Sequence, residues 1–332
     1  RVQCDEHGVL LVDVPWAEPG SGYTAMFESV VIDWLLRTDL QSVAQMLELS
    51  WGVVDRIMQR AVARGLARRE ELYPMNLSVD ETSFQKRHEY VTVVTDQDSS
   101  RVLYVADDRT TQSLDGFYRT LTSQQRAGIR SVAMDMWPAF IRATVTAVPD
   151  AISKIAFDKF HVAKYLGDAL DGVRRAEHKG LQQRGDKRLN GTRYQWLINP
   201  INMSREQKQH FAQLRQSTLR TARAWAMRQE AMSLWDYKSR SWAQKGWSRW
   251  LGWAQRCRLE PMKKVGQTIK RHLWGIVNAI VLKSHNGHSE SMNSRIQRIK
   301  RRACGFRNRE RFRNAIYFHC GGLDLYPATI NR

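Results

Sequence analysis

The sequence has few cysteines, and none of them forms a closely spaced pair. Its 332 residues contain four, Cys4, Cys257, Cys304 and Cys320, so neither a disulfide framework nor a complete zinc site is indicated. No run approaches the roughly 18 consecutive apolar residues of a membrane span, and the opening RVQCDEHG lacks the apolar core of a secretory signal. We therefore expect a soluble cytoplasmic protein that does not enter the membrane.

Acidic residues are scarce in the second half of the chain. The formal net charge is +19, and residues 166–332 contain 34 Lys and Arg against 11 Asp and Glu, whereas residues 1–165 contain 18 and 22. A field of one sign and this size indicates a polyanionic partner, and nucleic acid is the commonest one in a cytoplasm. Ribosomal or membrane-surface binding would give a similar charge distribution.

The first 72 residues predict an irregular arm and a DNA-binding domain. Residues 1–23 are rich in Pro and Gly, and residues 24–72 show apolar periodicity typical of three helices, over Met26–Leu36, Leu40–Leu47 and Trp51–Arg64. Two short helices and a tight turn are typical of a helix-turn-helix domain. An ordinary three-helix packing unit is the alternative interpretation.

The third of these helices is expected to be the recognition helix. Ser50 would cap it, and its inward face would carry Val54, Ile57, Met58 and Ala61. The remaining face is basic, and we predict that its arginines bind DNA phosphates and base edges. These are Arg56, Arg60 and Arg64.

Residues 73–165 change to strand-like patterns. LSVDETS, YVTVVTD and RVLYVAD are expected to form three strands, followed by a helix over Asp115–Leu121, a strand at IRSVAMDM, a helix over Pro138–Val148 and a strand at SKIAFD. This βββαβαβ order predicts an α/β fold with a mixed sheet, because crossover helices join the later strands. The first and fourth strands can then lie side by side.

Residues 166–283 are expected to be helical, basic and rich in tryptophan. Trp247, Trp250 and Trp253 recur every three residues within WAQKGWSRWLGWAQR. Such rings could fill the core of a helical bundle or stack on unpaired bases. Core packing is the interpretation we favour for most of them.

Residues 284–332 begin with an intensely basic helix that contains a single carboxylate, Glu290. An apolar stripe of this helix is expected to be buried, at Met292, Ile296, Ile299 and Ala303. A second face would align Glu290, Asn293, Ser294, Gln297 and Arg301. We expect phosphates near Glu290 to be held by Lys300, Arg301, Arg302 and Arg307. The simpler alternative is that Glu290 is a first-turn acid favoured by the helix dipole.

Three carboxylates are candidate metal ligands. Asp80 closes LSVD and Asp135 closes SVAMD, and ligands collect beyond the carboxyl ends of neighbouring strands in open sheets. With Glu290 they would provide hard oxygen donors that suit two Mg²⁺ or Mn²⁺ ions in phosphoryl transfer. Alternatively, Asp80 begins a turn and Asp135 caps the next helix.

A second small cluster follows the last predicted strand. Asp158 and His161, in FDKFH, could line the same site, orient a ligand or hold a substrate phosphate. A helix-capping aspartate with a structural histidine is an equally good interpretation. We treat Asp158, His161 and Asn293 as candidate accessory residues of the site.

Several motifs resemble the ISL-three family of bacterial insertion-sequence transposases. They are VPWAEPGSGYT, SVDETSF, MDMW, FDKFHV, SHNGHSESMNSRIQRIKRRACGFRN and CGGLDLYP, and the long C-terminal motif is the most specific. The resemblance implies DDE chemistry on an RNase H-like fold, with metal ligation by Asp80, Asp135 and Glu290. It also implies that the helical region over 166–283 is inserted between the parts of the catalytic domain, residues 73–165 and 284–332.

The resulting hypothesis is a DNA transposase that cleaves and joins the ends of its element. It would bind the inverted repeats as double-stranded DNA, act as a homodimer, and associate with the bacterial nucleoid. The alternatives are a metal-dependent nuclease of the same fold without strand transfer, or a non-catalytic DNA-binding protein derived from a transposase. Family members usually begin with a zinc-binding module, whereas only Cys4 stands near the start, so we expect structural zinc only if an upstream module exists.

Overall fold

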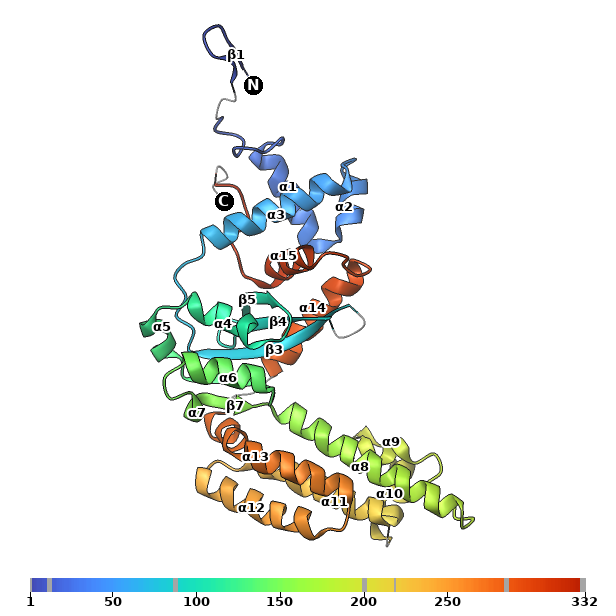
Figure 1. Cartoon of the computed structure of the whole chain (residues 1–332). Coiled ribbons are helices and arrows are strands. Elements are labelled where there is room, and N and C mark those ends of the chain that lie inside the picture. Colours follow the sequence, from blue (N-terminus) through green and yellow to red (C-terminus); the bar gives the residue numbers. More distant parts are fainter. Residues whose placement is uncertain are drawn as a thin grey trace. The chain divides into compact units, whose positions relative to one another are not determined.

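The computed structural model describes residues 2–10, 14–85, 89–198, 202–217, 219–283 and 287–328 (Figure 1). The chain divides into two compact units. The first unit comprises Arg1–Pro74, Val79–Gly128 and Gly287–Arg332, and the second comprises Met75–Ser78 and Ile129–Asn286. Each unit therefore joins segments that are far apart in the sequence.

Three helices follow the N-terminal arm, as predicted. They are α1 (Ala25–Arg37), α2 (Leu40–Met46) and α3 (Trp51–Ala67). Thr24 and Asp39 accept the capping hydrogen bonds that begin α1 and α2. The predicted inward residues of α3 are all buried, namely Val54, Ile57, Met58 and Ala61. Ser50 occupies the N-cap of α3 but makes no side-chain capping bond, contrary to expectation.

The predicted strand order is confirmed. The strands are β3 (Asn76–Gln85), β4 (Glu89–Asp96), β5 (Arg101–Asp107), β6 (Ser131–Met134) and β7 (Ile155–Phe157). Their order in the sheet is β5-β4-β3-β6-β7, with β3 parallel to β6 and β6 parallel to β7. The first and fourth strands of the predicted series are therefore neighbours. The turn expected between β3 and β4 includes residues 86–88, which lie outside the described part of the chain.

Four helices accompany the strands. The crossover helices are α4 (Thr111–Arg119) and α6 (Pro138–Ala147), close to the predicted ranges. Two shorter helices were not predicted, α5 (Ser123–Gly128) and α7 (Ala151–Lys154). The position of Pro138 at the start of α6 suits its missing N–H, because the first helical turn leaves such groups unpaired.

The chain after β7 is helical, as expected from its composition. Its elements are α8 (Lys159–Gln182), α9 (Arg193–Leu197), α10 (Arg205–Gln216), α11 (Arg220–Ser233), the 3₁₀ turn η2 (Leu234–Asp236), α12 (Arg240–Arg256) and α13 (Glu260–Leu282). Helix α8 packs against α11 and α13, and α12 packs against α13 (Figure 1). Trp196, Trp247 and Trp250 are fully buried, which confirms core packing for them.

Helix α13 also packs closely against β7. A Cβ atom at Gly275 would lie 2.4 Å from the ring of Phe157, so only glycine allows this approach. Asn278, buried on the same helix, donates to the backbone carbonyls of Ile152 and Ile155. These contacts hold the long helices to the sheet within the second unit.

The last two helices complete the first unit. They are α14 (Gly287–Arg302) and α15 (Arg309–Cys320). Phe318 of α15 joins the apolar core of α1 to α3, while Phe312 and Ile316 pack with residues of β3 to β5. A short hairpin, β1 (Val2–Cys4) with β2 (Gly8–Leu10), lies near the N-terminus. In the described ranges, no helix is long and apolar enough to span a membrane.

Candidate active site and DNA interface

Asp80 was expected at the end of a strand, but it lies inside β3. The strand continues to Gln85, whereas its parallel pairing with β6 runs from Asn76 to Ser78. The Asp80 carboxylate accepts hydrogen bonds from the backbone N–H of Glu81 at 2.8 Å and from the Asn293 amide at 2.7 Å. It is therefore held in one orientation by a strand and by helix α14.

Helix α14 is fixed along β3 by three polar side chains. Besides Asn293, Gln297 donates to the hydroxyl of Thr82 at 2.9 Å, and Lys300 Nζ donates to the carbonyl of Ser83 at 2.8 Å. Positions separated by four and then three residues share one helix face. The prediction that Asn293 and Gln297 share a polar face is thus confirmed. Lys300 was expected to hold DNA phosphate, but its ammonium binds the protein backbone.

The same helix presents Glu290 one turn before Asn293. Residues three apart lie on one face, so Glu290 shares the side of α14 that contacts Asp80. Its side chain is exposed. The predicted apolar stripe is buried at Met292 and Ile296, and Ile299 packs against it. Burial of this stripe therefore orients the face that carries Glu290.

The second unit positions Asp135 with two further predicted residues. Asp135 follows β6 directly, and its carboxylate accepts the N–H of Met136. His161 Nδ1 lies 3.4 Å from Asp135 Oδ2, and His161 Nε2 lies 3.8 Å from Asp158 Oδ2. Asp158 is 7% exposed and caps α8 by accepting the N–H of Phe160. The capping interpretation of Asp158 is correct, and His161 joins it to Asp135.

Asp135 does not cap the following helix. The N-cap of α6 is Trp137, with no side-chain capping bond. The carboxylate therefore lacks the structural role that was the alternative to metal binding. Chemically, Asp80, Asp135 and Glu290 offer the hard oxygen donors that Mg²⁺ requires. Among the residues whose placement is described, no three His, Cys, Asp or Glu side chains are grouped so as to hold a metal ion.

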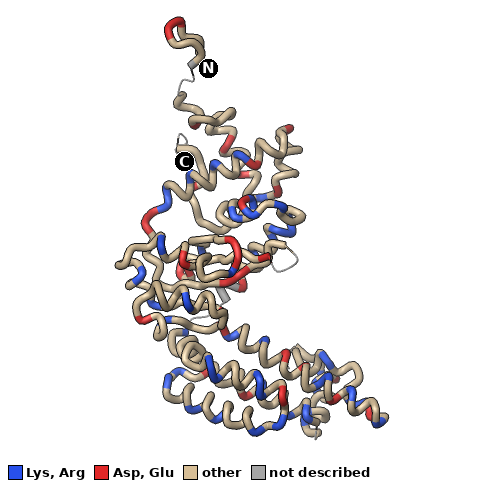
Figure 2. Tube along the Cα trace, in the orientation of Figure 1, with Lys and Arg blue, Asp and Glu red and all other residues tan. Residues whose placement is uncertain are grey.

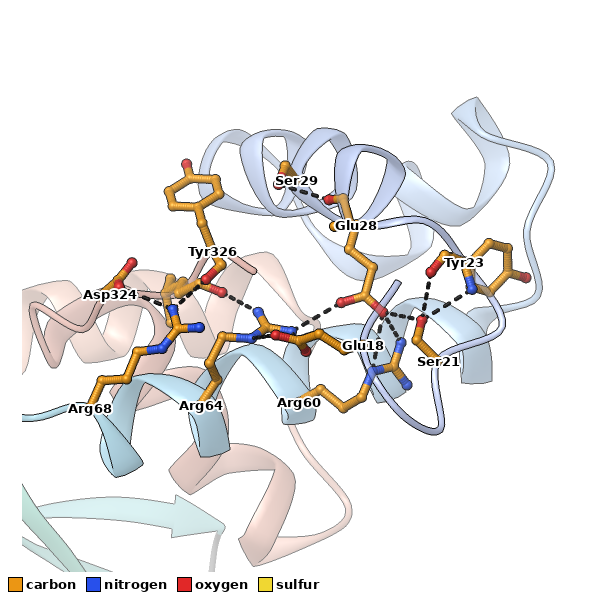
Figure 3. A network of polar contacts seen from close by, with 12 residues as sticks. Glu18, Ser21, Tyr23, Glu28, Ser29, Arg60, Arg64, Arg68, Asp324 and Tyr326 are labelled. Carbon is orange, nitrogen blue, oxygen red and sulfur yellow. Dashed lines mark hydrogen bonds and ion pairs between the residues drawn. The ribbon is translucent and has the colours of Figure 1, made fainter. Parts of the chain in front are cut away.

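Two arginines of the recognition helix have partners inside the protein (Figure 3). Arg60 and Arg64 both pair with Glu28 of α1, and Arg64 also pairs with Glu18. Glu28 is 1% exposed. The prediction that Arg60 and Arg64 bind DNA did not anticipate these ion pairs, which use their charges to fix α3 against α1 and the N-terminal arm. Arg56 is exposed and remains a candidate for DNA contact.

The basic end of α14 lies beside the recognition helix in the first unit. A cavity of about 400 Å³ is lined by Leu40 and Gln41 of α2, Trp51 of α3, and Arg302, Arg307 and Arg311. Arg301, Arg302 and Arg307 are exposed. The N-terminal end of a recognition helix is the part that contacts base edges. The arginines predicted near Glu290 therefore extend the surface of the helix-turn-helix domain.

Trp51 and Arg311 are surface residues that the sequence did not identify. The Arg311 guanidinium lies 4.5 Å from the centre of the Trp51 ring, and Arg311 Nε donates to the buried carboxylate of Asp55 at 3.0 Å. These contacts fix the side chain at the start of α3. No local pattern could have indicated them, because Asp55 and Arg311 are 256 positions apart.

An adjoining cavity of about 270 Å³ is lined by Arg295, Arg298 and Arg302 of α14, with Asp39 and His319. The pKa of His319 is lowered from 6.5 to about 4, chiefly by burial and also by the positive charges of Arg302 and Arg295. His319 is therefore neutral in the folded protein at neutral and mildly acidic pH.

The neutral His319 makes stability depend on pH. In the unfolded chain His319 has its ordinary pKa of 6.5. Between about pH 6.5 and pH 4, therefore, the unfolded state binds a proton that the folded state does not bind. We expect this to cost about 2 kcal/mol of unfolding free energy between pH 7 and pH 5. The free energy of unfolding, measured with urea at both pH values, should fall less between pH 7 and pH 5 in His319→Gln than in the wild type. The exposed His7→Gln should keep the wild-type drop, and an unchanged drop in His319→Gln would contradict this account.

The N-terminal hairpin holds a second candidate zinc ligand. Cys4 Sγ lies 3.5 Å from His7 Nδ1, and the turn between β1 and β2 separates the two residues. Cys-x-x-His supplies two of the four ligands of a tetrahedral zinc site. Only Cys4 was expected as a zinc ligand near the start of the chain, and His7 is a second candidate. All four cysteines are free thiols, in agreement with the expected lack of disulfides.

Comparison with known proteins identifies the family. A family model described as "Transposase", of the ISL3 type, matches residues 77–316, and one described as "Helix-turn-helix domain of transposase family ISL3" matches residues 12–62. The chain belongs to the ISL3 family of transposases. The first model covers β3 to α15, and the second covers α1, α2 and most of α3.

Two named transposases align over nearly all of the chain. The transposase for insertion sequence element IS1557 of Mycobacterium tuberculosis is 29% identical, over 93% of this chain and 74% of its own length. The transposase for insertion sequence element IS1001 of Bordetella parapertussis is 28% identical, over 94% and 77%. The resemblance given by the sequence motifs is thereby confirmed.

Proposed function

We propose that this ISL3-family transposase cleaves and joins DNA at a site formed by Asp80, Asp135 and Glu290. The observation that carries the proposal is the parallel register of β3 and β6. Ser78 pairs with Ala133, and each aspartate follows two residues later, Asp80 within β3 and Asp135 directly after the end of β6. Side chains two residues apart point to the same face, which favours a shared position for the two carboxylates. The hydrogen bond from Asn293 to Asp80 supports the inclusion of Glu290, which lies one turn earlier on the same face of α14.

The three carboxylates would hold two Mg²⁺ or Mn²⁺ ions. When bound, such ions stabilise charge on the attacking and leaving oxygens of a phosphodiester. Asn293 keeps one oxygen of Asp80 turned toward α14, and His161 does the same for Asp135 from α8. Asp158 fixes His161 at the helix start. Asn293, His161 and Asp158 are thus positioning residues in this proposal.

The reaction proceeds by direct displacement at phosphorus. Water attacks the phosphodiester at the element end and releases a 3′ hydroxyl, which then attacks a phosphodiester of the target. Each step forms one P–O bond and breaks one, so no covalent protein intermediate is needed. We propose an RNase H-like core for this chemistry, with the helices α8 to α13 as an insertion between β7 and α14.

DNA binding is assigned to a surface that combines two parts of the first unit. Arg56 of α3, Arg301 and Arg302 at the end of α14, and Arg307 in the turn between α14 and α15 are exposed. The lining shared by α2, α3 and the α14–α15 turn supports a continuous contact with duplex inverted repeats. Two ends must be brought together for strand transfer, so we expect a homodimer on DNA.

A strand-transfer assay tests the proposal. Purified full chain is incubated with Mg²⁺ and a supercoiled target, together with a duplex that carries either a pre-cut or an uncut element end. We expect joined products in which the 3′ end is linked to the target. Cleavage of uncut ends without any joined product would instead indicate a nuclease. Binding without cleavage or joining would indicate a non-catalytic DNA-binding protein.

A further inference from the structure

Helix α12 presents a stripe of exposed basic residues with one exposed tryptophan. Its buried side is formed by Ala243, Trp247, Trp250 and Ala254, among others. The opposite side carries Trp242, Lys245, Arg249 and Arg256, all exposed. These four positions are separated by three, four and seven residues, so they form one line along the helix.

Trp242 differs from the other large side chains of α12. It is 60% exposed, whereas Trp247 and Trp250 are at most 1% exposed. The Lys245 ammonium lies 5.3 Å from the centre of the Trp242 ring. An indole this exposed contributes little to the core, and it lies beside a cation where it can be reached by a ligand.

The charge around this stripe has one sign. Helix α12 contains no Asp or Glu, and residues 240–283 contain ten Lys and Arg with a single acid, Glu260. That acid is paired with Lys263 at 2.9 Å. Figure 2 shows Lys and Arg recurring along α12 and α13. The exposed acids nearest to α12 in sequence are Asp236, four residues before the helix, and Glu260, four residues after it.

We propose that this stripe binds a DNA strand with unpaired bases. Lys245, Arg249 and Arg256 span about 16 Å of helix and would contact successive phosphates. Trp242 would stack on a base at one end of the stripe. The base must be unpaired, because in a duplex the neighbouring bases already cover its faces. The inference rests on the proposed function, in which the protein cuts element ends and joins them to a target.

Binding to a 20-nucleotide dT strand, without metal, tests the proposal on the full chain. This probe carries no inverted repeat and requires no cleavage, so the test is independent of the active site. We expect Lys245→Ala/Arg249→Ala/Arg256→Ala to reduce the slope of log affinity against log salt by about 2. Alanine suits exposed helix positions, so the fold should be kept.

A matched control removes the same charge elsewhere on the second unit. Arg184, Lys187 and Lys208 are exposed, and their triple alanine variant should keep the wild-type slope. If both triple variants reduce the slope equally, only the overall charge matters and the proposed stripe is wrong. An unchanged slope in the α12 variant would also overturn it.

Trp242 is tested by comparing single and double strands. Trp242→Ala should weaken binding of dT about tenfold and leave binding of a blunt duplex of the same length unchanged. Trp242→Phe should restore most of the loss, because the phenyl ring can still stack. An equal loss on both DNAs, or no loss on dT, would overturn the stacking role.

Discussion

Replacing Asp80 by Asn is expected to abolish DNA cleavage and strand joining while leaving DNA binding intact. The amide keeps the size of the side chain and can still contact Asn293, but it removes the negative charge that would hold the metal. Loss of several kcal/mol of transition-state stabilisation lowers the rate at least about a thousandfold. The rate is measured by single-turnover cleavage in Mg²⁺, with binding measured in parallel by fluorescence anisotropy.

The control for this substitution is Asp96→Asn. Asp96 ends the neighbouring strand β4 and binds the turn that follows, through Ser99. We expect it to keep cleavage, whereas Asp135→Asn and Glu290→Gln should lose cleavage as completely as Asp80→Asn. Normal cleavage by any one of these three variants, in a protein that remains folded, would remove that residue from the site.

Replacing Glu28 by Ala is expected to destabilise the helix-turn-helix domain by about 3 to 5 kcal/mol. Glu28 is buried and pairs with Arg60 and Arg64, and Arg64 has a side chain only 7% exposed. Without Glu28, much of the compensation for a buried guanidinium is lost (Figure 3). Urea unfolding, followed by fluorescence, measures the loss, and binding of the inverted repeat should fall with it.

Arg307→Ala provides the contrast. Arg307 is exposed in the turn between α14 and α15, so its loss should weaken DNA binding without changing the unfolding midpoint. If Glu28→Ala instead left stability unchanged, the ion pairs of Arg60 and Arg64 would not be structural. Arg60 and Arg64 would then again be candidates for DNA contact.

The sheet was predictable because its strands are nearly continuous apolar runs. The βββαβ order allowed β3 and β6 to lie side by side, and the structure pairs them in parallel. The helix α14 was equally clear, because Met292 and Ile296 recur at helical spacing and are buried. The strand that carries Asp80 and the helix that carries Glu290 were thus predictable, whereas the shared role of Asp80, Asp135 and Glu290 as metal ligands stays a prediction.

Long-range polar contacts could not be predicted. Arg60 and Arg64 find Glu28 across 32 and 36 residues, and Lys300 finds Ser83 across 217. In each case a basic side chain looked available for phosphate because its partner lies far away in the sequence. The buried and exposed tryptophans of α12, however, can be told apart from the sequence. Ala243, Trp247, Trp250 and Ala254 follow helical spacing, which leaves Trp242 on the outside.

The most direct test of the central claim is a map of the metal site by Fe²⁺. Iron bound in place of Mg²⁺ generates hydroxyl radicals with ascorbate and peroxide, and these cut the chain near the ion. We predict cuts near residues 80, 135 and 290 in the same sample, all of them suppressed by excess Mg²⁺ and absent in Asp80→Asn. Cuts near only one of these positions, or a pattern that Asp80→Asn leaves unchanged, would contradict a shared site of three carboxylates.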